Sequence, residues 1–279
     1  MNGIDFAAAL PHPPVFVEGI GSKRDHEVVR TSLAAYAQVA RQIVETDPEL
    51  IIIATPHGRL FRDCFFVSSG TDAHGDWRTF GRDPERYEVL FDEEFAEALL
   101  DEAESAGITC VAGVDPVLDH GVMVPLHFIL AAGLDGTRCR FARISISLLD
   151  EQTHYGLGQC VQQAVLARGC RAVFIASGDL SHHLKKEGPY GFTPEGPEFD
   201  KAVCEAFASA DFARFFSFDS TFREQAGECG LNSFLMMAGV FDGFAVDSHF
   251  YSYEGPWGVG YGIASFQRGS KDPSRTFSN

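Results

Sequence analysis

The chain has 279 residues, of which 45% are hydrophobic and 22% charged, the balance of a soluble globular protein. Its formal net charge of −17 argues against a nucleic-acid or anionic-membrane partner, because binding to either needs clustered lysine and arginine side chains. Seven cysteines without a CxxC spacing, no signal-peptide pattern and no apolar run of about 20 residues predict a cytoplasmic protein with reduced thiols and no membrane-spanning helix.

In the first half of the chain, short apolar runs alternate with segments whose apolar residues recur at helical spacing. The polar stretch 70–88 is rich in Gly, Asp and Arg and is predicted to be a loop that could serve as a lid. The other predicted elements are strands at 4–10, 50–54, 65–67 and 108–111, and helices at 26–45, 91–106 and 122–132.

The second half continues the alternation, with a Gly/Pro-rich loop at 188–197. Its predicted elements are strands at 140–147, 172–176, 245–253 and 258–266, and helices at 151–168, 198–208, 212–216 and 228–240. No internal repeat or linker interrupts this pattern, so one α/β domain over 1–268 is expected. The polar residues 269–279 are expected to form a disordered tail.

Two histidines follow apolar strands directly, each on a turn stiffened by proline. His12 lies between Pro11 and Pro13 after the first strand, and His57 follows Pro56 after the second. Ligand sites collect at the carboxyl ends of strands in open α/β sheets. Two neutral imidazoles and one carboxylate on such turns can hold a non-haem ferrous ion with open positions. The sequence therefore predicts a shared site, although each turn alone could be a surface feature.

The third donor is less well defined. Glu228 opens the predicted helix 228–240 and could complete the ligand set, or its carboxylate could simply cap the helix. The adjacent Cys229 is a soft alternative that would favour copper or zinc over iron. Glu254, in a tight turn between two strands, is a competing carboxylate that ranks below Glu228.

Two further histidines could act as acids, bases or hydrogen-bond donors beside a metal. His182 follows the strand 172–176 and could accept a proton from a metal-bound phenol, with Asp179 or Ser181 orienting its ring. His120 precedes a predicted helix and could donate a hydrogen bond to substrate or dioxygen, or act only as a local cap. His127, about two turns further on, is expected in the core or beside the site.

These motifs resemble the class III extradiol ring-cleaving dioxygenases, and more closely the related domain of AmmeMemoRadiSam system proteins; the Memo proteins are more distant. The resemblance to the dioxygenases rests on Pro11-His12-Pro13, Pro56-His57-Gly58, Asp119-His120-Gly121 and Gly178 to His182. The closer resemblance rests on Glu195-Gly196-Pro197-Glu198-Phe199-Asp200, Glu228-Cys229-Gly230 and Tyr253-Glu254-Gly255-Pro256 with Gly258-Val259-Gly260-Tyr261.

The resemblance implies a single α/β domain with a mixed central β-sheet flanked by helices on both faces. It also implies His12, His57 and Glu228 as Fe(II) ligands, His182 as the acid/base and His120 as a contact to substrate or oxygen. The expected reaction is extradiol ring cleavage of a small catechol-type aromatic substrate by O2, in a chain that could form homo-oligomers.

The same resemblance leaves alternatives open. Memo-like relatives carry a cysteine at the third-ligand position, so the ligand could be Cys229, with zinc or copper as the metal. The chain could also be a Memo-like metal-binding partner of an AMME-type protein and a radical enzyme, without cleaving catechols. Metal-assisted hydrolysis at the same site is a third possibility.

Overall fold

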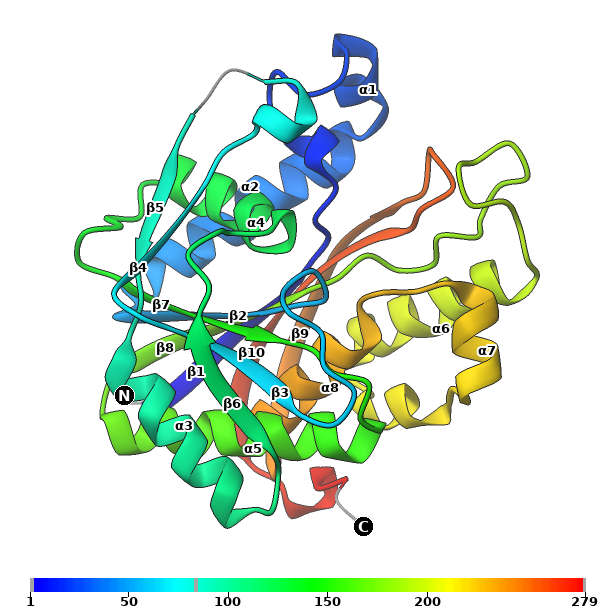
Figure 1. The fold of residues 1–279 in the computed structure, drawn as a ribbon. Coiled ribbons are helices and arrows are strands. Elements are labelled where there is room, and N and C mark those ends of the chain that lie inside the picture. Colours follow the sequence, from blue (N-terminus) through cyan, green and yellow to red (C-terminus); the bar gives the residue numbers. More distant parts are fainter. Residues whose placement is uncertain (1–2, 83–84, 278–279) are drawn as a thin grey trace.

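A mixed eight-stranded sheet forms the centre of the protein in a computed structural model, which describes residues 3–82 and 85–277 (Figure 1). Its strands in spatial order are β6 (Cys110–Val114), β3 (Phe65–Ser69), β7 (Arg140–Ser145), β2 (Leu50–Thr55), β8 (Arg171–Ser177), β1 (Gly3–Leu10), β10 (Tyr261–Lys271) and β9 (Phe244–Glu254). The four central strands β7, β2, β8 and β1 are parallel, and β3 and β10 pair with them antiparallel. The predicted α/β fold with a mixed sheet is therefore confirmed.

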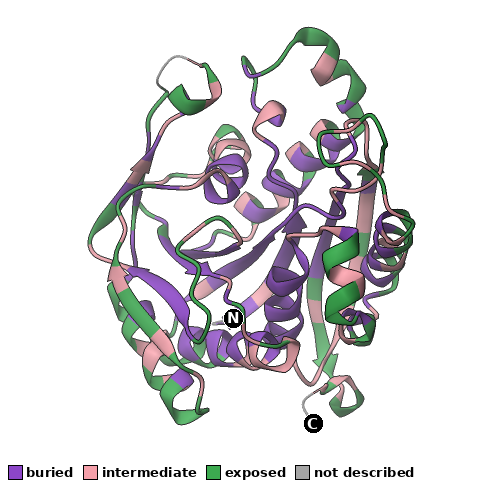
Figure 2. Cartoon of the chain, turned by 45° about the vertical axis from the view of Figure 1, so that its right-hand side comes forward, coloured by how far each residue is buried: buried purple, intermediate pink, exposed green. Residues whose placement is uncertain are grey.

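Helices cover both faces of the sheet. Because successive side chains of a strand point to opposite faces, Ile51 and Ile53 of β2 pack on one side while Ile52 packs on the other. One layer contains α2 (Arg30–Glu45) and α4 (His120–Ala131), and the other contains α3 (Glu93–Ser105), α5 (Glu151–Arg168), α6 (Glu195–Ser209) and α8 (Leu231–Val240). Figure 2 shows the buried residues concentrated in the sheet and on the helix faces toward it. Within residues 3–82 and 85–277, no helix is long and apolar enough to cross a membrane.

Several smaller elements differ from the expectations. The predicted loop 70–88 contains two paired strands on either side of a short helix, and the predicted helix 228–240 begins only at Leu231. The predicted helix 26–45 is divided at Val29, whose backbone leaves the helical region. The smaller elements are β4 (Asp72–Gly75), β5 (Tyr87–Leu90), α1 (Lys23–Val28), α7 (Ser220–Ala226), η1 (Pro14–Phe16), η2 (Arg78–Phe80), η3 (Phe212–Ser217) and η4 (Pro273–Arg275).

The segment 269–277, expected to belong to a disordered tail, has a defined structure. Strand β10 continues to Lys271, which pairs with Phe244 at the start of β9. The short helix η4 follows, and the main-chain N–H of Phe277 donates to the hydroxyl of Tyr155 on α5. These contacts to β9 and α5 hold the segment against the domain; residues 278–279 of the expected tail lie outside the described residues.

Candidate metal centre

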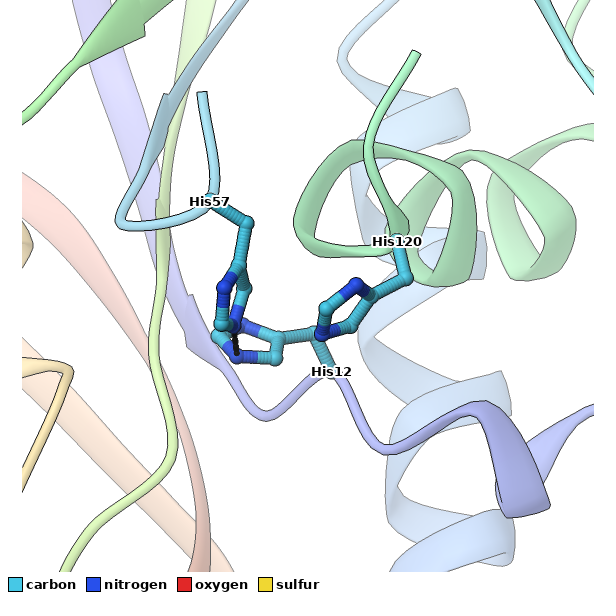
Figure 3. Close-up of side chains that lie close together, drawn as sticks. All are labelled: His12, His57 and His120. Carbon is cyan, nitrogen blue, oxygen red and sulfur yellow. Dashed lines mark hydrogen bonds between the residues drawn. The ribbon is translucent and has the colours of Figure 1, made fainter. Parts of the chain in front are cut away.

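Three histidines from three separate turns meet at the carboxyl end of the central strands. His12 follows β1, His57 follows β2, and His120 is the first residue of α4. Since β1, β8 and β2 are parallel neighbours, their carboxyl ends lie along one edge of the sheet. The Nε2 atoms of His12 and His57 are 2.9 Å apart, and one ring nitrogen of each of the three histidines lies within 4.8 Å of the others. Figure 3 shows the three rings turned toward one another.

His12 is held in one orientation and one tautomer by its neighbours. Its ring Nδ1 lies 2.9 Å from Ser177 Oγ, and that hydroxyl donates its proton to the main-chain carbonyl of Gly121 at 2.6 Å. The Ser177 oxygen is therefore an acceptor for Nδ1–H, which leaves the lone pair of neutral His12 on Nε2, the atom facing His57. The His12 main-chain N–H also donates to the Asp179 carboxylate at 2.9 Å. Metal-binding histidines are usually oriented by such a bond from the ring N–H that does not face the metal.

The environment favours neutral imidazoles. Burial, together with the nearby His120 and His182, holds the pKa of His12 well below its usual range. Partial burial and the neighbouring histidines, with His12 first among them, lower the pKa of His57 to about 3. Burial also lowers the pKa of His120. All three rings are thus in the neutral form that binds metals.

The donor set fits a metal ion. Two imidazole nitrogens that bind one ion at the usual distance of about 2.1 Å lie about 3 Å apart when they occupy adjacent positions at a right angle. The observed separation of 2.9 Å between the Nε2 atoms of His12 and His57 matches this value. Imidazole ligands suit iron, zinc and copper alike, so the cluster does not by itself select the metal.

Cys229 is brought next to the cluster by a close backbone contact. A Cβ atom on Gly178, directly after β8, would lie 2.2 Å from the Cα atom of Gly230, so the two turns can approach only without side chains there. Cys229 Sγ consequently lies 3.7 Å from His12 Nε2 and accepts the main-chain N–H of Asp179 at 3.3 Å. Burial raises the pKa of the Cys229 thiol. The thiol is a fourth donor within reach of the same site.

The two carboxylates considered from sequence have other partners. Glu228 Oε1 accepts from Arg223 Nε at 2.9 Å, and Oε2 accepts the main-chain N–H of Leu231 at 2.7 Å, which caps α8. Its side chain is only 4% exposed, and it does not belong to the histidine grouping found in the described part of the chain. Glu254 Oε2 accepts from the main-chain N–H and the hydroxyl of Ser32 on α2.

His182 follows β8 near the cluster and carries an unpaired nitrogen. Its Nε2 atom is buried and has no hydrogen-bond partner among the described residues. The predicted orienting groups bond elsewhere, since the Asp179 carboxylate accepts from the His12 main chain and Ser181 Oγ donates to a carbonyl of α7. The ring of Tyr190, in the loop after His182, lies 5.2 Å from the His182 ring. A substrate group could supply the missing partner of Nε2.

Two other histidines have local structural partners. His127 Nδ1 lies 2.8 Å from the hydroxyl of Tyr87 on β5, so this residue links α4 to the small β4–β5 sheet. His183 Nδ1 lies 2.5 Å from the main-chain carbonyl of Gln225 at the end of α7. His127 is half-buried and lies two turns further along α4 than His120, on the same face of that helix.

Two polar residues that end central strands support the site and were not predicted from the sequence. Ser177 is the last residue of β8 and holds His12, while Thr55 is the last residue of β2 and accepts the main-chain N–H of His57 at 3.2 Å. Their common signal is a buried hydroxyl residue that closes an otherwise apolar strand immediately before a site turn.

Fold and site together define an α/β protein with a histidine cluster that could hold a metal ion, and comparison with known proteins identifies its family. Residues 6–264 match the family of the catalytic LigB subunit of aromatic ring-opening dioxygenases, and the chain belongs to this family. The resemblance inferred from the motifs is therefore confirmed.

Individual relatives include both a ring-opening dioxygenase subunit and a MEMO1 family protein. The chain is 32% identical to Protein CA_C1420 of Clostridium acetobutylicum over 95% of its own length, but it spans only 58% of that relative. It is 25% identical to the 2-aminophenol 1,6-dioxygenase beta subunit of a Pseudomonas species, over 77% of this chain and 78% of that one. A MEMO1 family protein of Pyrococcus furiosus is 29% identical over 47% of this chain and 42% of the relative.

A solved structure shows the same fold. The uncharacterized protein JW3007 from Escherichia coli K12 superposes with a TM-score of 0.61 at 15% sequence identity, covering 94% of this chain and 99% of that chain. At this level of identity the likeness concerns the fold alone.

Proposed function

We propose that this protein is a non-haem Fe(II) dioxygenase of the extradiol type, which opens the ring of a catechol-type aromatic substrate. The observation that carries the proposal is the pair of neutral imidazoles whose Nε2 atoms lie 2.9 Å apart, together with the buried Nε2 atom of His182, which has no hydrogen-bond partner in the described part of the chain. Both atoms of O2 would enter the product as the bond between a hydroxyl-bearing carbon and its neighbour breaks. No external reductant is needed, because the substrate supplies the electrons.

His12 and His57 would hold the metal, and bound Fe(II) would supply the electronic coupling between substrate and dioxygen. The chain's own residues supply positioning and proton transfer. His182 Nε2 would accept a proton from a substrate hydroxyl, and burial lowers the pKa of His182, so its ring is available as a base. His120 would contact substrate or oxygen from the start of α4, where its ring lies 4.0 Å from the His57 ring.

For the third protein donor, Cys229 Sγ lies 3.7 Å from His12 Nε2, and a ring nitrogen of His120 lies within 4.8 Å of those of His12 and His57. Glu228, which the resemblance suggests, would have to release Arg223 and the Leu231 amide before it could bind a metal. Metal binding would also require loss of the proton from Cys229, whose thiolate the Asp179 N–H would stabilise. We therefore propose that Cys229 is better placed than Glu228 for the third ligand, whereas Glu228 is the donor that would favour iron.

One observation favours a second candidate function. A thiol beside two histidines favours zinc or copper over iron, and the similarity to a MEMO1 family protein covers nearly half of the chain. The chain could therefore be a metal-binding partner protein, working with an AMME-type protein, without opening aromatic rings. In that case the unpaired His182 nitrogen would have no catalytic use.

Oxygen uptake by anaerobically purified, Fe(II)-loaded protein, offered a panel of catechols and aminophenols, tests the proposal. We expect uptake matched by a coloured ring-opened product, and we expect His182→Asn to retain its iron while turnover falls by about 100-fold or more. Full iron occupancy with no uptake across the panel would instead support the partner-protein function.

A further inference from the structure

A buried arginine on the central strand β7 contacts the segment that leads to His120. Arg143 is 2% exposed and faces the segment that joins β6 to α4. Its Nη1 donates to the carbonyl of Val117 at 2.7 Å, its Nη2 donates to the carbonyl of Asp115 at 2.9 Å, and its Nε donates to Ser68 Oγ at 2.7 Å. The same guanidinium lies 2.9 Å from the Asp115 carboxylate and 3.6 Å from that of Asp119.

The segment held by Arg143, residues 115–119, is contacted from several sides. It forms no regular element and Val117 is 60% exposed, but Leu118 is buried in the core, and the main chain at Pro116 and Leu118 bonds to His74 of β4. The planar fork of the guanidinium adds to these contacts, because it donates to two carbonyls of the segment and lies within ion-pair distance of the Asp115 and Asp119 carboxylates. A buried charge is costly unless it is fully paired, so the arginine and the segment constrain each other.

The end of this segment is connected to two of the three cluster histidines. Asp119 caps α4, whose first residue is His120, by accepting the main-chain N–H of Val122. Its Oδ1 also accepts the Thr55 hydroxyl at 2.8 Å, and Thr55 Oγ1 in turn accepts the main-chain N–H of His57 at 3.2 Å. One carboxylate thus fixes both the helix that presents His120 and the turn that presents His57.

We propose that Arg143 is a positioning residue for the candidate metal centre, acting through Asp119 and Thr55 on His57 and through the start of α4 on His120. This inference rests on the proposed metal-binding function of the cluster. It concerns how the site is held, so its experiment includes a readout that needs neither a metal nor turnover.

Two matched hydroxyl deletions separate this role from simple stabilisation. Thr55 and Ser68 are both buried, and each contributes one hydroxyl to the network, but only Thr55 lies between Asp119 and His57. We expect Thr55→Val to weaken Co(II) binding about 10-fold and to alter the visible spectrum of the Co(II) protein. Thr55→Ser, which keeps the hydroxyl, should restore both, and Ser68→Ala should leave both as in the wild type.

Hydrogen–deuterium exchange of the metal-free protein gives the independent readout. Residues 56–58 should exchange faster in Thr55→Val than in Ser68→Ala, because only the first variant loses the acceptor of the His57 amide. Arg143→Lys, which keeps the charge but loses the fork, should speed exchange in both 56–58 and 119–121.

These readouts also distinguish the two ideas. Absence of oxygen uptake with normal Co(II) spectra and the expected exchange pattern would contradict the proposed function while supporting the positioning role. The proposal for Arg143 would be overturned if residues 56–58 exchanged at the wild-type rate in both Thr55→Val and Arg143→Lys. It would also be overturned if these two variants bound Co(II) with the same affinity as Ser68→Ala.

Discussion

Replacing Ser177 with alanine tests whether the hydroxyl at the end of β8 prepares His12 for metal binding. The change removes the acceptor of His12 Nδ1–H and the donor to the Gly121 carbonyl, both in a buried setting. A buried polar group left without its partner costs about 1–3 kcal/mol. Loss of such an outer partner of a metal-binding histidine lowers metal affinity about 10- to 100-fold, which corresponds to about 1.4–2.7 kcal/mol.

Competitive titration of Co(II) against a chelating dye measures this affinity. Ser233→Ala is the matched control, because Ser233 is also fully buried but its hydroxyl has no partner among the described residues. We expect the Ser177 variant to bind Co(II) about 10- to 100-fold more weakly than the Ser233 variant. Equal affinities in the two variants would show that the tautomer of His12 is not set by Ser177.

The remaining predictions concern the third donor and a buried acid. Cys229→Ser should lower the metal affinity by about 10-fold or more. Glu228→Gln should keep its metal, but its free energy of unfolding in urea should fall by about 1–3 kcal/mol, because Arg223 is left incompletely paired. The reverse pattern would identify Glu228 as the ligand. Burial raises the pKa of Asp200 to about 7, so the folded protein retains a proton that the unfolded chain loses near pH 4, and stability falls as pH rises through this window. Between about pH 5.5 and about pH 8, the Asp200 carboxyl should lower the free energy of unfolding of the wild type by about 2 kcal/mol. In Asp200→Asn this fall should be absent. Parallel plots of unfolding free energy against pH for the two proteins would refute the raised pKa of Asp200.

The convergence of the site could be predicted from the sequence because it depends on local patterns. Apolar strands followed by Pro-His turns indicate where β1 and β2 end, and the carboxyl ends of parallel neighbours lie together. His12 and His57 could therefore be assigned to one site before their distance was known. The α/β class followed from the same alternation of strands and helices, and its mixed sheet from the resemblance.

The third donor and the supporting residues depend on contacts between distant parts of the chain. Whether Glu228 or Cys229 faces His12 depends on the close approach of Gly178 and Gly230, which no local pattern announces. The glutamate beside it fits a helix cap equally well, and that is the contact the structure shows.

Arg143 illustrates the same difficulty. Within its strand it looks like an ordinary alternating polar residue, because its partners Ser68 and Asp115 are far away in sequence. The paired strands β4 and β5 in the segment 70–88 were likewise missed, since their composition is that of a loop and they are stabilised by packing against the domain.

Isotope labelling with ¹⁸O2 tests the central claim most directly. Fe(II)-loaded protein would be incubated with the catechols and aminophenols of the panel under labelled dioxygen, and the products analysed by mass spectrometry beside a His57→Ala control. The account predicts a ring-opened product in which both atoms of one O2 molecule are incorporated by the wild type, and none with the variant. Iron-loaded wild type that yields no labelled ring-opened product from any member of the panel would contradict it.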